Sequence, residues 1–126
     1  MTPKQHLIQG IDTVILRVSN IENAKNWYIE KLGFGLLYED PASRLAVLDT
    51  YGPTSLTLWQ TDYTLSVHRD TANYPILKTV QVEALRNELV HRGVEASEIS
   101  YGDGVSFFQF FDPDGNVLEA CQLDAS

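Results

Sequence analysis

Eight short runs of mainly apolar residues are distributed along the chain, and each run predicts a β-strand. The runs are rich in β-branched and aromatic residues and are bounded by turn-forming residues. They lie at residues 11–18, 34–38, 44–48, 55–59, 76–80, 94–100, 107–111 and 117–121. In the first run, strict alternation places Thr13, Ile15 and Arg17 on one face of the strand, opposite its more apolar face.

Two other segments have apolar residues at intervals of three and four, which predicts amphipathic helices. The first begins after Asn20, a residue type that caps helix N-termini, and ends at Gly33. The second has Arg92 near its C-terminal end and ends at Gly93. Their apolar faces consist of Ile21, Ala24, Trp27, Tyr28 and Leu32 in the first helix and of Val82, Leu85, Leu89 and Val90 in the second. Each helix is expected to pack against a sheet.

The last two strands flank residues 112–116, Asp-Pro-Asp-Gly-Asn, which predicts a hairpin. Pro113 favours a type I turn, and Gly115 takes the left-handed position that follows it. The final strand carries Glu119 among apolar residues. A carboxylate in such a strand either faces solvent or lines a site that binds it.

The order strand, helix and three strands occurs twice. Residues 15–26 align with residues 76–87, and the final strands of the two units align at residues 56–60 and 118–122. The identical pairs are Ile15/Ile76, Leu16/Leu77, Glu22/Glu83, Asn26/Asn87, Leu56/Leu118 and Gln60/Gln122. A repeated unit that cannot bury its own sheet must pair with its twin or with another subunit.

The pattern therefore predicts an α+β fold with a single domain over residues 1–126. A first βαβββ module is expected at residues 11–60, a polar linker at 61–73 and a second βαβββ module at 74–122. With 126 residues the chain is long enough for one domain with a substantial core.

Composition excludes several classes of function. The formal net charge of −8 argues against a nucleic-acid partner, which requires clustered Lys and Arg. No apolar run approaches the roughly 18 residues of a membrane span, so we expect no membrane partner and a location in the cytoplasm. The single Cys121 excludes an intramolecular disulfide and a multi-cysteine metal site.

The repeated module, the Leu32-Gly33-Phe34 end of the first helix and the final Asp-Pro-Asp-Gly-Asn segment followed by Glu119 together carry a resemblance. Over residues 11–122 the chain resembles the vicinal oxygen chelate superfamily, which includes glyoxalase I, extradiol dioxygenases and fosfomycin- and bleomycin-resistance proteins. The resemblance implies two βαβββ modules whose curved mixed sheets form a common cavity. It also implies that the cavity is usually completed in a homodimer.

In metal-using members of that superfamily, four residues from the first and last strands of each module hold a divalent ion. The internal repeat places these positions at Thr13, Thr57, Tyr74 and Glu119. Threonine hydroxyls and a phenol are poor ligands at neutral pH, so we expect no metal and no other cofactor. The alternative is a displaced divalent metal site that His68, or His6 of another subunit, completes.

Alternation from these positions predicts the residues that bind a ligand. They are Thr13, Arg17, Thr57, Trp59, Tyr74, Lys78 and Glu119. Trp59 and Tyr74 either stack on a flat ring or cation or fill a reduced cavity as core aromatics. Arg17 and Lys78 bind an anionic ligand, pair with Glu119 or point into water. Some glyoxalase I sequences are similar in having Arg at the position of Arg17. One further wall consists of Phe107, Gln109 and Phe111, or else of Phe108 and Phe110.

Three functions are compatible with this set of residues. The first is a homodimeric protein that, like the bleomycin-resistance proteins it resembles, binds a small organic molecule in a metal-free cavity. The second is a metal-dependent lyase, isomerase or dioxygenase of the superfamily with a displaced metal site, in which Glu119 is the catalytic base. The third is a sensory or partner domain whose cavity is vestigial.

Overall fold

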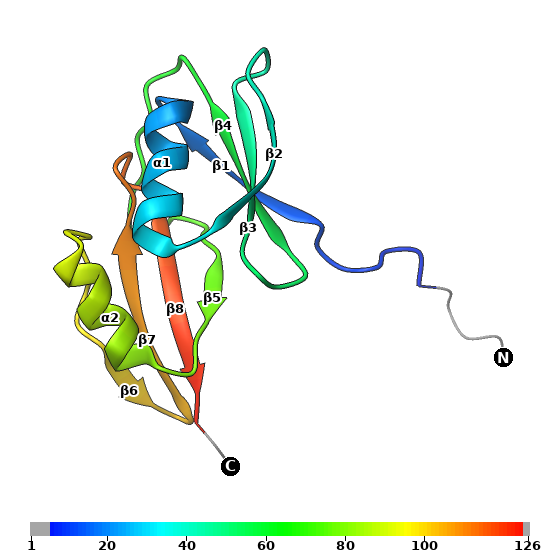
Figure 1. Cartoon of the computed structure of the whole chain (residues 1–126). Helices are drawn as coiled ribbons and strands as arrows, with labels where there is room; N and C mark the ends of the chain where they lie inside the picture. Colours follow the sequence, from blue (N-terminus) through cyan, green and yellow to red (C-terminus); the bar gives the residue numbers. More distant parts are fainter. Residues whose placement is uncertain (1–5, 125–126) are drawn as a thin grey trace, which may run out of the picture.

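The computed structural model describes residues 6–124 and contains two modules of the same design (Figure 1). Each module consists of a strand, a helix and three strands, so the predicted α+β fold of two βαβββ modules is confirmed. The first module contains β1 (Thr13–Val18), α1 (Ile21–Leu32), β2 (Gly35–Asp40), β3 (Leu45–Asp49) and β4 (Ser55–Gln60). The second contains β5 (Ile76–Lys78), α2 (Val82–His91), β6 (Ser100–Gly102), β7 (Val105–Phe111) and β8 (Val117–Leu123).

Both modules form a four-stranded mixed sheet with the same topology. The strand orders are β1-β4-β3-β2 and β5-β8-β7-β6. In each sheet the first strand pairs in parallel with the last strand, and the remaining pairs are antiparallel. The internal repeat in the sequence therefore corresponds to a repeat in strand pairing.

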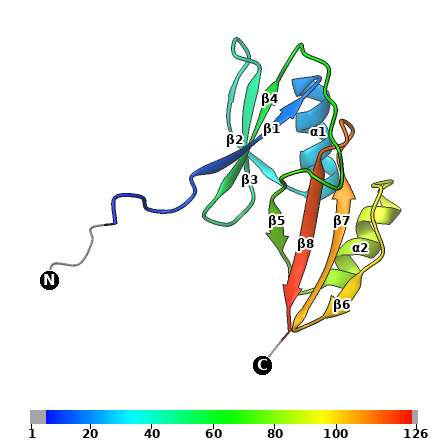
Figure 2. The same cartoon turned by 180° about the vertical axis from the view of Figure 1, so that it is seen from behind.

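One face of each sheet is buried under the helix of its own module, and the two buried faces belong to one hydrophobic core. The core side chains of the sheets are Leu16, Val18, Leu48, Leu56 and Leu58 in the first module and Phe108, Phe110, Leu118 and Ala120 in the second. Figures 1 and 2 show the helices lying against their sheets from the two sides of the molecule. The sheet faces away from the helices are therefore the surfaces left for function.

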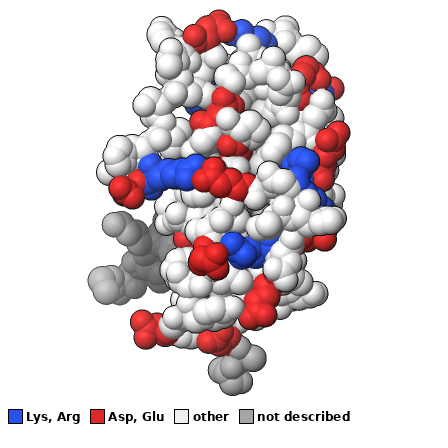
Figure 3. Space-filling model, turned by 90° about the vertical axis from the view of Figure 1, so that its left-hand side faces the viewer, with Lys and Arg blue, Asp and Glu red and all other residues white. Residues whose placement is uncertain are grey.

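The outer surface of the helical side is polar and mixed in charge. Lys25 of α1 pairs with Glu22 and Glu39, and Arg92 after α2 pairs with Glu88. Figure 3 views this side, and its Lys and Arg side chains lie next to Asp and Glu side chains without forming a continuous basic area. This surface has the pattern of a solvated helical face.

The turn between β7 and β8 docks onto the first module through a buried carboxylate. The Tyr28 hydroxyl donates a 2.7 Å hydrogen bond to Oδ2 of Asp112, and Nδ2 of Asn116 donates to the same oxygen at 2.8 Å. Asn116 Nδ2 also lies 2.9 Å from the carbonyl oxygen of Arg17, and the Ser19 amide donates to Asp114. The predicted turn is confirmed, and it joins the two modules.

A glutamine at the end of each module caps the helix of that module. Oε1 of Gln60 accepts a 2.9 Å hydrogen bond from the Ile21 amide, and Oε1 of Gln122 accepts a 2.8 Å bond from the Val82 amide. These two amides open α1 and α2, where backbone donors lack partners within the helix. The identity of Gln60 and Gln122 in the repeat therefore has a structural cause.

Replacing these glutamines is expected to affect the two helices unequally. Helix α1 is also capped by Asn20, whereas Gln81 makes no capping hydrogen bond with its side chain at the start of α2. We expect Gln122→Ala to lower the free energy of unfolding by about 1–2 kcal/mol and Gln60→Ala by about 0.5 kcal/mol. Urea unfolding of both variants measures the difference, and a larger effect at Gln60 would contradict this interpretation.

The predicted strand at residues 94–100 is wrong, as is the predicted four-residue turn at 101–104. The first of these segments forms no strand and pairs with β7 through the isolated bridge Ala96 to Phe110, which backbone hydrogen bonds from Ser97 to Gln109 and from Phe111 to Glu95 flank. Oγ of Ser97 accepts a hydrogen bond from the Gln109 amide in place of a backbone carbonyl, which interrupts the ladder. Strand β6 follows at Ser100–Gly102 instead, and Asp103 and Gly104, both with positive φ, form a tighter turn.

Candidate functional site

The sheet faces away from the helices, here called the open faces, are only partly covered by the chain itself. Across the first sheet, Ile15 pairs with Thr57, Thr57 with Val47 and Val47 with Tyr38. Ile15 and Tyr38 are at least half exposed, whereas Thr57 is buried between its neighbours. The open face of the first module thus has a polar residue, Thr57, at its centre and the exposed side chains of Ile15 and Tyr38 on either side.

The open face of the second module repeats this arrangement. Ile76 pairs with Glu119, which pairs with Gln109 on the other side. Ile76 is more than half exposed, whereas Glu119 is only 7% exposed and occupies the position of Thr57 in the repeat. The carboxylate of Glu119 therefore lies at the centre of the second open face.

The structure decides which side of β7 belongs to the open face. Phe108 and Phe110 are buried in the core. Gln109 pairs with Glu119, so Phe107, Gln109 and Phe111 lie on the open face. Of the two predicted walls, the first is the one that the fold forms.

The four positions of the superfamily metal site are only partly brought together. Oγ1 of Thr13 lies 2.8 Å from Oγ1 of Thr57, and it also donates to the Ser55 carbonyl oxygen at 3.1 Å. Among residues 6–124, no hydrogen bond joins these hydroxyls to Tyr74 or to Glu119. Tyr74 instead borders a cavity of about 1030 Å³ between the modules, and neither threonine nor Glu119 lines this cavity.

The residues at these positions do not fit a divalent ion. The two threonine hydroxyls are neutral and already hydrogen-bonded, which leaves Glu119 as the one carboxyl group among the four positions. In the part of the chain that the structure describes, no three His, Cys, Asp or Glu side chains are grouped to hold a metal. His6 and His68 are exposed, and Nδ1 of His68 accepts from the Asp70 amide.

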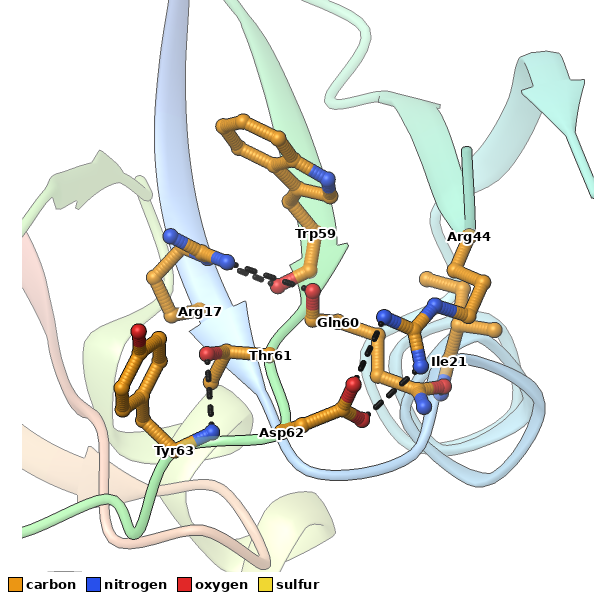
Figure 4. A network of polar contacts seen from close by, with 8 residues as sticks. All are labelled: Arg17, Ile21, Arg44, Trp59, Gln60, Thr61, Asp62 and Tyr63. Carbon is orange, nitrogen blue, oxygen red and sulfur yellow. Dashed lines mark hydrogen bonds and ion pairs between the residues drawn. The ribbon is translucent and has the colours of Figure 1, made fainter. Parts of the chain in front are cut away.

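Arg17 fixes the position of the Trp59 ring at the end of the first open face (Figure 4). Its Nε donates to the Trp59 carbonyl oxygen at 3.1 Å, and Nη2 donates to the Gln60 carbonyl oxygen at 3.2 Å. The guanidinium carbon lies 4.3 Å from the centroid of the Trp59 ring, which is a cation–π contact. Trp59 remains 39% exposed, so an aromatic surface is held in place next to solvent.

The predicted cations do not pair with the predicted carboxylate. Among the described residues, Arg17, Lys78 and Glu119 form no ion pair with one another. Lys78 is exposed and lines the cavity between the modules. Glu119 makes no hydrogen bond through its side chain to any residue from 6 to 124, and its backbone amide donates to Pro75.

Two arginines that the sequence did not single out support the ends of the open faces. Arg44 forms a double hydrogen bond with Asp62 at 2.9 and 3.1 Å, which lowers the pKa of that carboxyl (Figure 4). Arg69 of the linker pairs with Glu95 and lies 3.5 Å over the ring of Phe111. No sequence pattern marks either pair, because the partners are 18 residues apart in the first pair and 26 residues apart in the second.

Tyr38 was also missed as part of the open face. A bulge between Leu36 and Tyr38 shifts the register of β2 against β3 and sets the direction of Tyr38. Such a bulge reverses the alternation that a strand pattern assumes, and here no Gly or Pro marks it.

These features define a class of protein built from two βαβββ modules with an open sheet face on each. The chain matches the family model of the Glyoxalase/Bleomycin resistance protein/Dioxygenase superfamily over residues 10–120, and it belongs to this superfamily. No curated protein matches its sequence. Within residues 6–124, none of the helices has the length and hydropathy that crossing a membrane requires.

Several solved structures have the same fold. TnmS3, an antibiotic binding protein from Streptomyces sp. CB03234, is 27% identical, with a TM-score of 0.77 over 95% of this chain and 100% of its own. A glyoxalase family protein from Enterococcus faecalis is 28% identical, with a TM-score of 0.75 over 92% and 99%. A putative glyoxalase family protein from Bacillus anthracis has a TM-score of 0.82 over 96% and 100% at 19% identity.

Proposed function

We propose that this protein binds a small organic molecule on its open faces without a divalent metal ion. The observation that carries the proposal is the composition of these faces. They combine an aromatic surface held by Arg17 with the carboxylate of Glu119, a residue that is 7% exposed and whose side chain forms no ion pair with any residue from 6 to 124. A planar aromatic molecule with a basic or hydrogen-bond-donating group matches both features, because its ring stacks on Trp59 and its polar group reaches a carboxylate.

The proposed binding site includes a second copy of the chain. Ile15, Tyr38 and Ile76 on the open faces are exposed to solvent. Apolar sheet faces are normally covered by another element or subunit. A homodimer that places open faces opposite each other encloses a ligand and covers these side chains at once. TnmS3, which shares the fold at 27% identity, is described as an antibiotic binding protein, and this supports a binding function.

Matched planar probes of opposite charge test the proposal. Proflavine is a planar cation, and 1-pyrenesulfonate is a planar anion of similar size. In a Trp27→Phe background, so that Trp59 is the reporter, we expect proflavine to quench the fluorescence saturably and to bind more tightly than pyrenesulfonate. Glu119→Gln is expected to remove this preference for the cation. Failure of both probes to bind would overturn the proposal.

Arg17→Ala is expected to weaken proflavine binding about three- to fivefold, because the Trp59 ring loses the contact that orients it. Lys31→Ala is the control. Lys31 lies on α1 and donates to the carbonyl oxygen of Arg92, away from the open faces. Fluorescence titration measures both affinities. Equal affinities for the two variants would show that Arg17 does not contribute to ligand binding.

The second candidate is an enzyme of the superfamily with a displaced metal site. It is favoured by one observation, which is that Glu119 is 7% exposed and its side chain forms no ion pair within residues 6–124, an environment that suits a general base. Metal analysis of protein purified without chelator separates the candidates. Near-stoichiometric nickel, zinc, iron or manganese would favour the enzyme.

A further inference from the structure

A cavity of about 1030 Å³, here called the seam cavity, lies between the two modules. Its size is at the upper end of the range of about 300–1,000 Å³ that small-molecule sites occupy. Its walls come from both modules and include Val14, Leu32, Phe34, Leu77 and Leu85. These five side chains pack against the hydrophobic core but are only partly buried. The described residues therefore leave an apolar surface open between the modules.

The seam cavity adjoins the second open face but differs from it in composition. Ile76 of β5 belongs to both, because it lies on the open face and also lines the cavity. Trp59, Gln109 and Glu119, which define the open faces, do not line the cavity. The aromatic surface and the carboxylate of the proposed function therefore lie outside the seam cavity.

Lys78 is the one charged residue among the described residues that line the seam cavity. It is exposed, and it forms no ion pair with any residue from 6 to 124. The chain contains 17 Asp and Glu residues, and none of the described ones lines the cavity. The seam cavity thus combines an apolar wall with a single positive charge, in a protein whose net charge is −8.

The backbone of β5 adds hydrogen-bond donors to the same wall. In the described chain β5 is an edge strand, with β8 on one side and no strand on the other. The Thr79 amide donates to the Cys121 carbonyl oxygen of β8. Because alternate residues of a parallel strand bond to the neighbouring strand, the backbone N–H groups of Ile76 and Lys78 point away from β8. Both residues line the seam cavity, so an anion that contacts the Lys78 ammonium group also lies near these donors.

We propose that the seam cavity binds an elongated apolar monocarboxylate, whose chain lies on the apolar wall and whose carboxylate contacts Lys78. The single ammonium group balances one negative charge, whereas a dianion such as a phosphate monoester would keep an uncompensated charge against an apolar wall. Burial of the chain against the partly buried side chains of both modules supplies the hydrophobic part of the affinity. The inference goes beyond the proposed function and does not rest on it.

Probes that share a decyl chain and differ in charge test this inference by isothermal titration calorimetry, below the concentrations at which they form micelles. We expect decanoate to bind saturably, with one molecule per chain, and about tenfold more tightly than decyltrimethylammonium. Lys78→Gln is expected to weaken decanoate binding about tenfold and to leave decanol binding unchanged. Lys25→Gln is the matched control, because it removes the same charge from the outer surface of α1, where Lys25 pairs with Glu22 and Glu39. Equal decanoate affinities for the two variants, or no saturable binding of decanoate, would overturn the inference.

A second pair of variants tests where decanoate binds. Val80 lines the seam cavity and is 74% exposed, whereas Val90 of α2 is 46% exposed and lies outside the cavity, so both positions tolerate a polar side chain. We expect Val80→Glu to weaken decanoate binding about tenfold or more by charge repulsion, and Val90→Glu to have little effect. Equal effects of the two substitutions would overturn the seam site.

Trp59→Ala separates the seam cavity from the open faces. Trp59 does not line the cavity, so this variant is expected to bind decanoate as tightly as wild type. A loss of decanoate affinity in Trp59→Ala as large as its loss of proflavine affinity would place decanoate on the open faces and overturn the inference. Binding of proflavine without decanoate would overturn the seam site alone. Binding of decanoate without either planar probe would overturn the proposed function alone.

Discussion

Asp112→Ala is expected to lower the free energy of unfolding by about 3 kcal/mol or more, a large share of the roughly 5–15 kcal/mol that a domain possesses. The carboxylate accepts hydrogen bonds from Tyr28 and from Asn116 Nδ2, and also from the amides of Asp114 and Asn116. Without it, these donors lose their partner in a region where Tyr28 is fully buried. The loss also weakens the joint between the two modules.

Thermal and urea unfolding measure this effect against two controls. Asp70→Ala removes an exposed linker carboxylate and is expected to have little effect. Tyr28→Phe removes one donor and leaves the carboxylate with its other partners, so it is expected to cost about 1 kcal/mol. An Asp112→Ala variant as stable as Asp70→Ala would show that the turn does not join the modules.

The stability difference between wild type and Asp112→Ala is expected to depend on pH. Burial raises the pKa of Asp112 above its usual value, against the opposing hydrogen bonds from Asn116 and Tyr28. The folded state therefore holds this proton more tightly than the unfolded state. The contribution of the protonated Asp112 carboxyl to the free energy of unfolding is fully present below about pH 4. It is lost as the pH rises through the pKa of Asp112 in the folded state. Urea unfolding of both proteins between about pH 3 and pH 7, the range in which carboxyl groups ordinarily titrate, measures whether this stability difference falls as the pH rises.

Trp59→Ala is expected to weaken proflavine binding about 30-fold, as removal of a central aromatic anchor typically does. The ring is partly exposed, and Arg17 holds it from one side. A ligand that stacks on the ring loses its largest contact area when the ring is removed. Trp59→Phe keeps an aromatic face and is expected to restore most of the affinity.

Fluorescence anisotropy of proflavine itself measures this series, because the variant has lost the reporter at position 59. Tyr101→Ala is the matched control. Tyr101 is an exposed aromatic residue of β6 that donates to Glu83, away from the open faces. Equal affinities for Trp59→Ala and Tyr101→Ala would mean that the ligand does not stack on Trp59.

Much of the fold could be predicted because the same order of strands and helix is seen in both halves of the sequence. Asn20 and Gly33 mark the ends of α1 by capping, and both take the expected conformation. Gln60 and Gln122 align in the sequence because both cap a helix. The segment around Ser97 could not be predicted, since a side-chain hydrogen bond that interrupts the ladder leaves the strand pattern unchanged.

For the candidate site, the sequence could predict which face of a strand each residue lies on, but not how residues of different sheets are placed relative to one another. Alternation placed Thr57, Trp59 and Glu119 on faces away from the core, since a strand has only two faces. Alternation carries no information about the distance between two sheets or about a neighbouring side chain such as Arg17 over Trp59. Tyr74 lies before β5 and borders the seam cavity, which depends on how the modules pack.

Proflavine titration before and after removal of divalent ions tests most directly whether the open faces bind organic molecules without a metal. The protein is treated with chelator, dialysed and titrated, and the titration is repeated after zinc, nickel or manganese is added back. We expect the same affinity in every case, because in the proposed site Trp59 and Glu119, and no metal ion, contact the ligand. Loss of binding with the chelator and its recovery with one of the metals would contradict this mechanism.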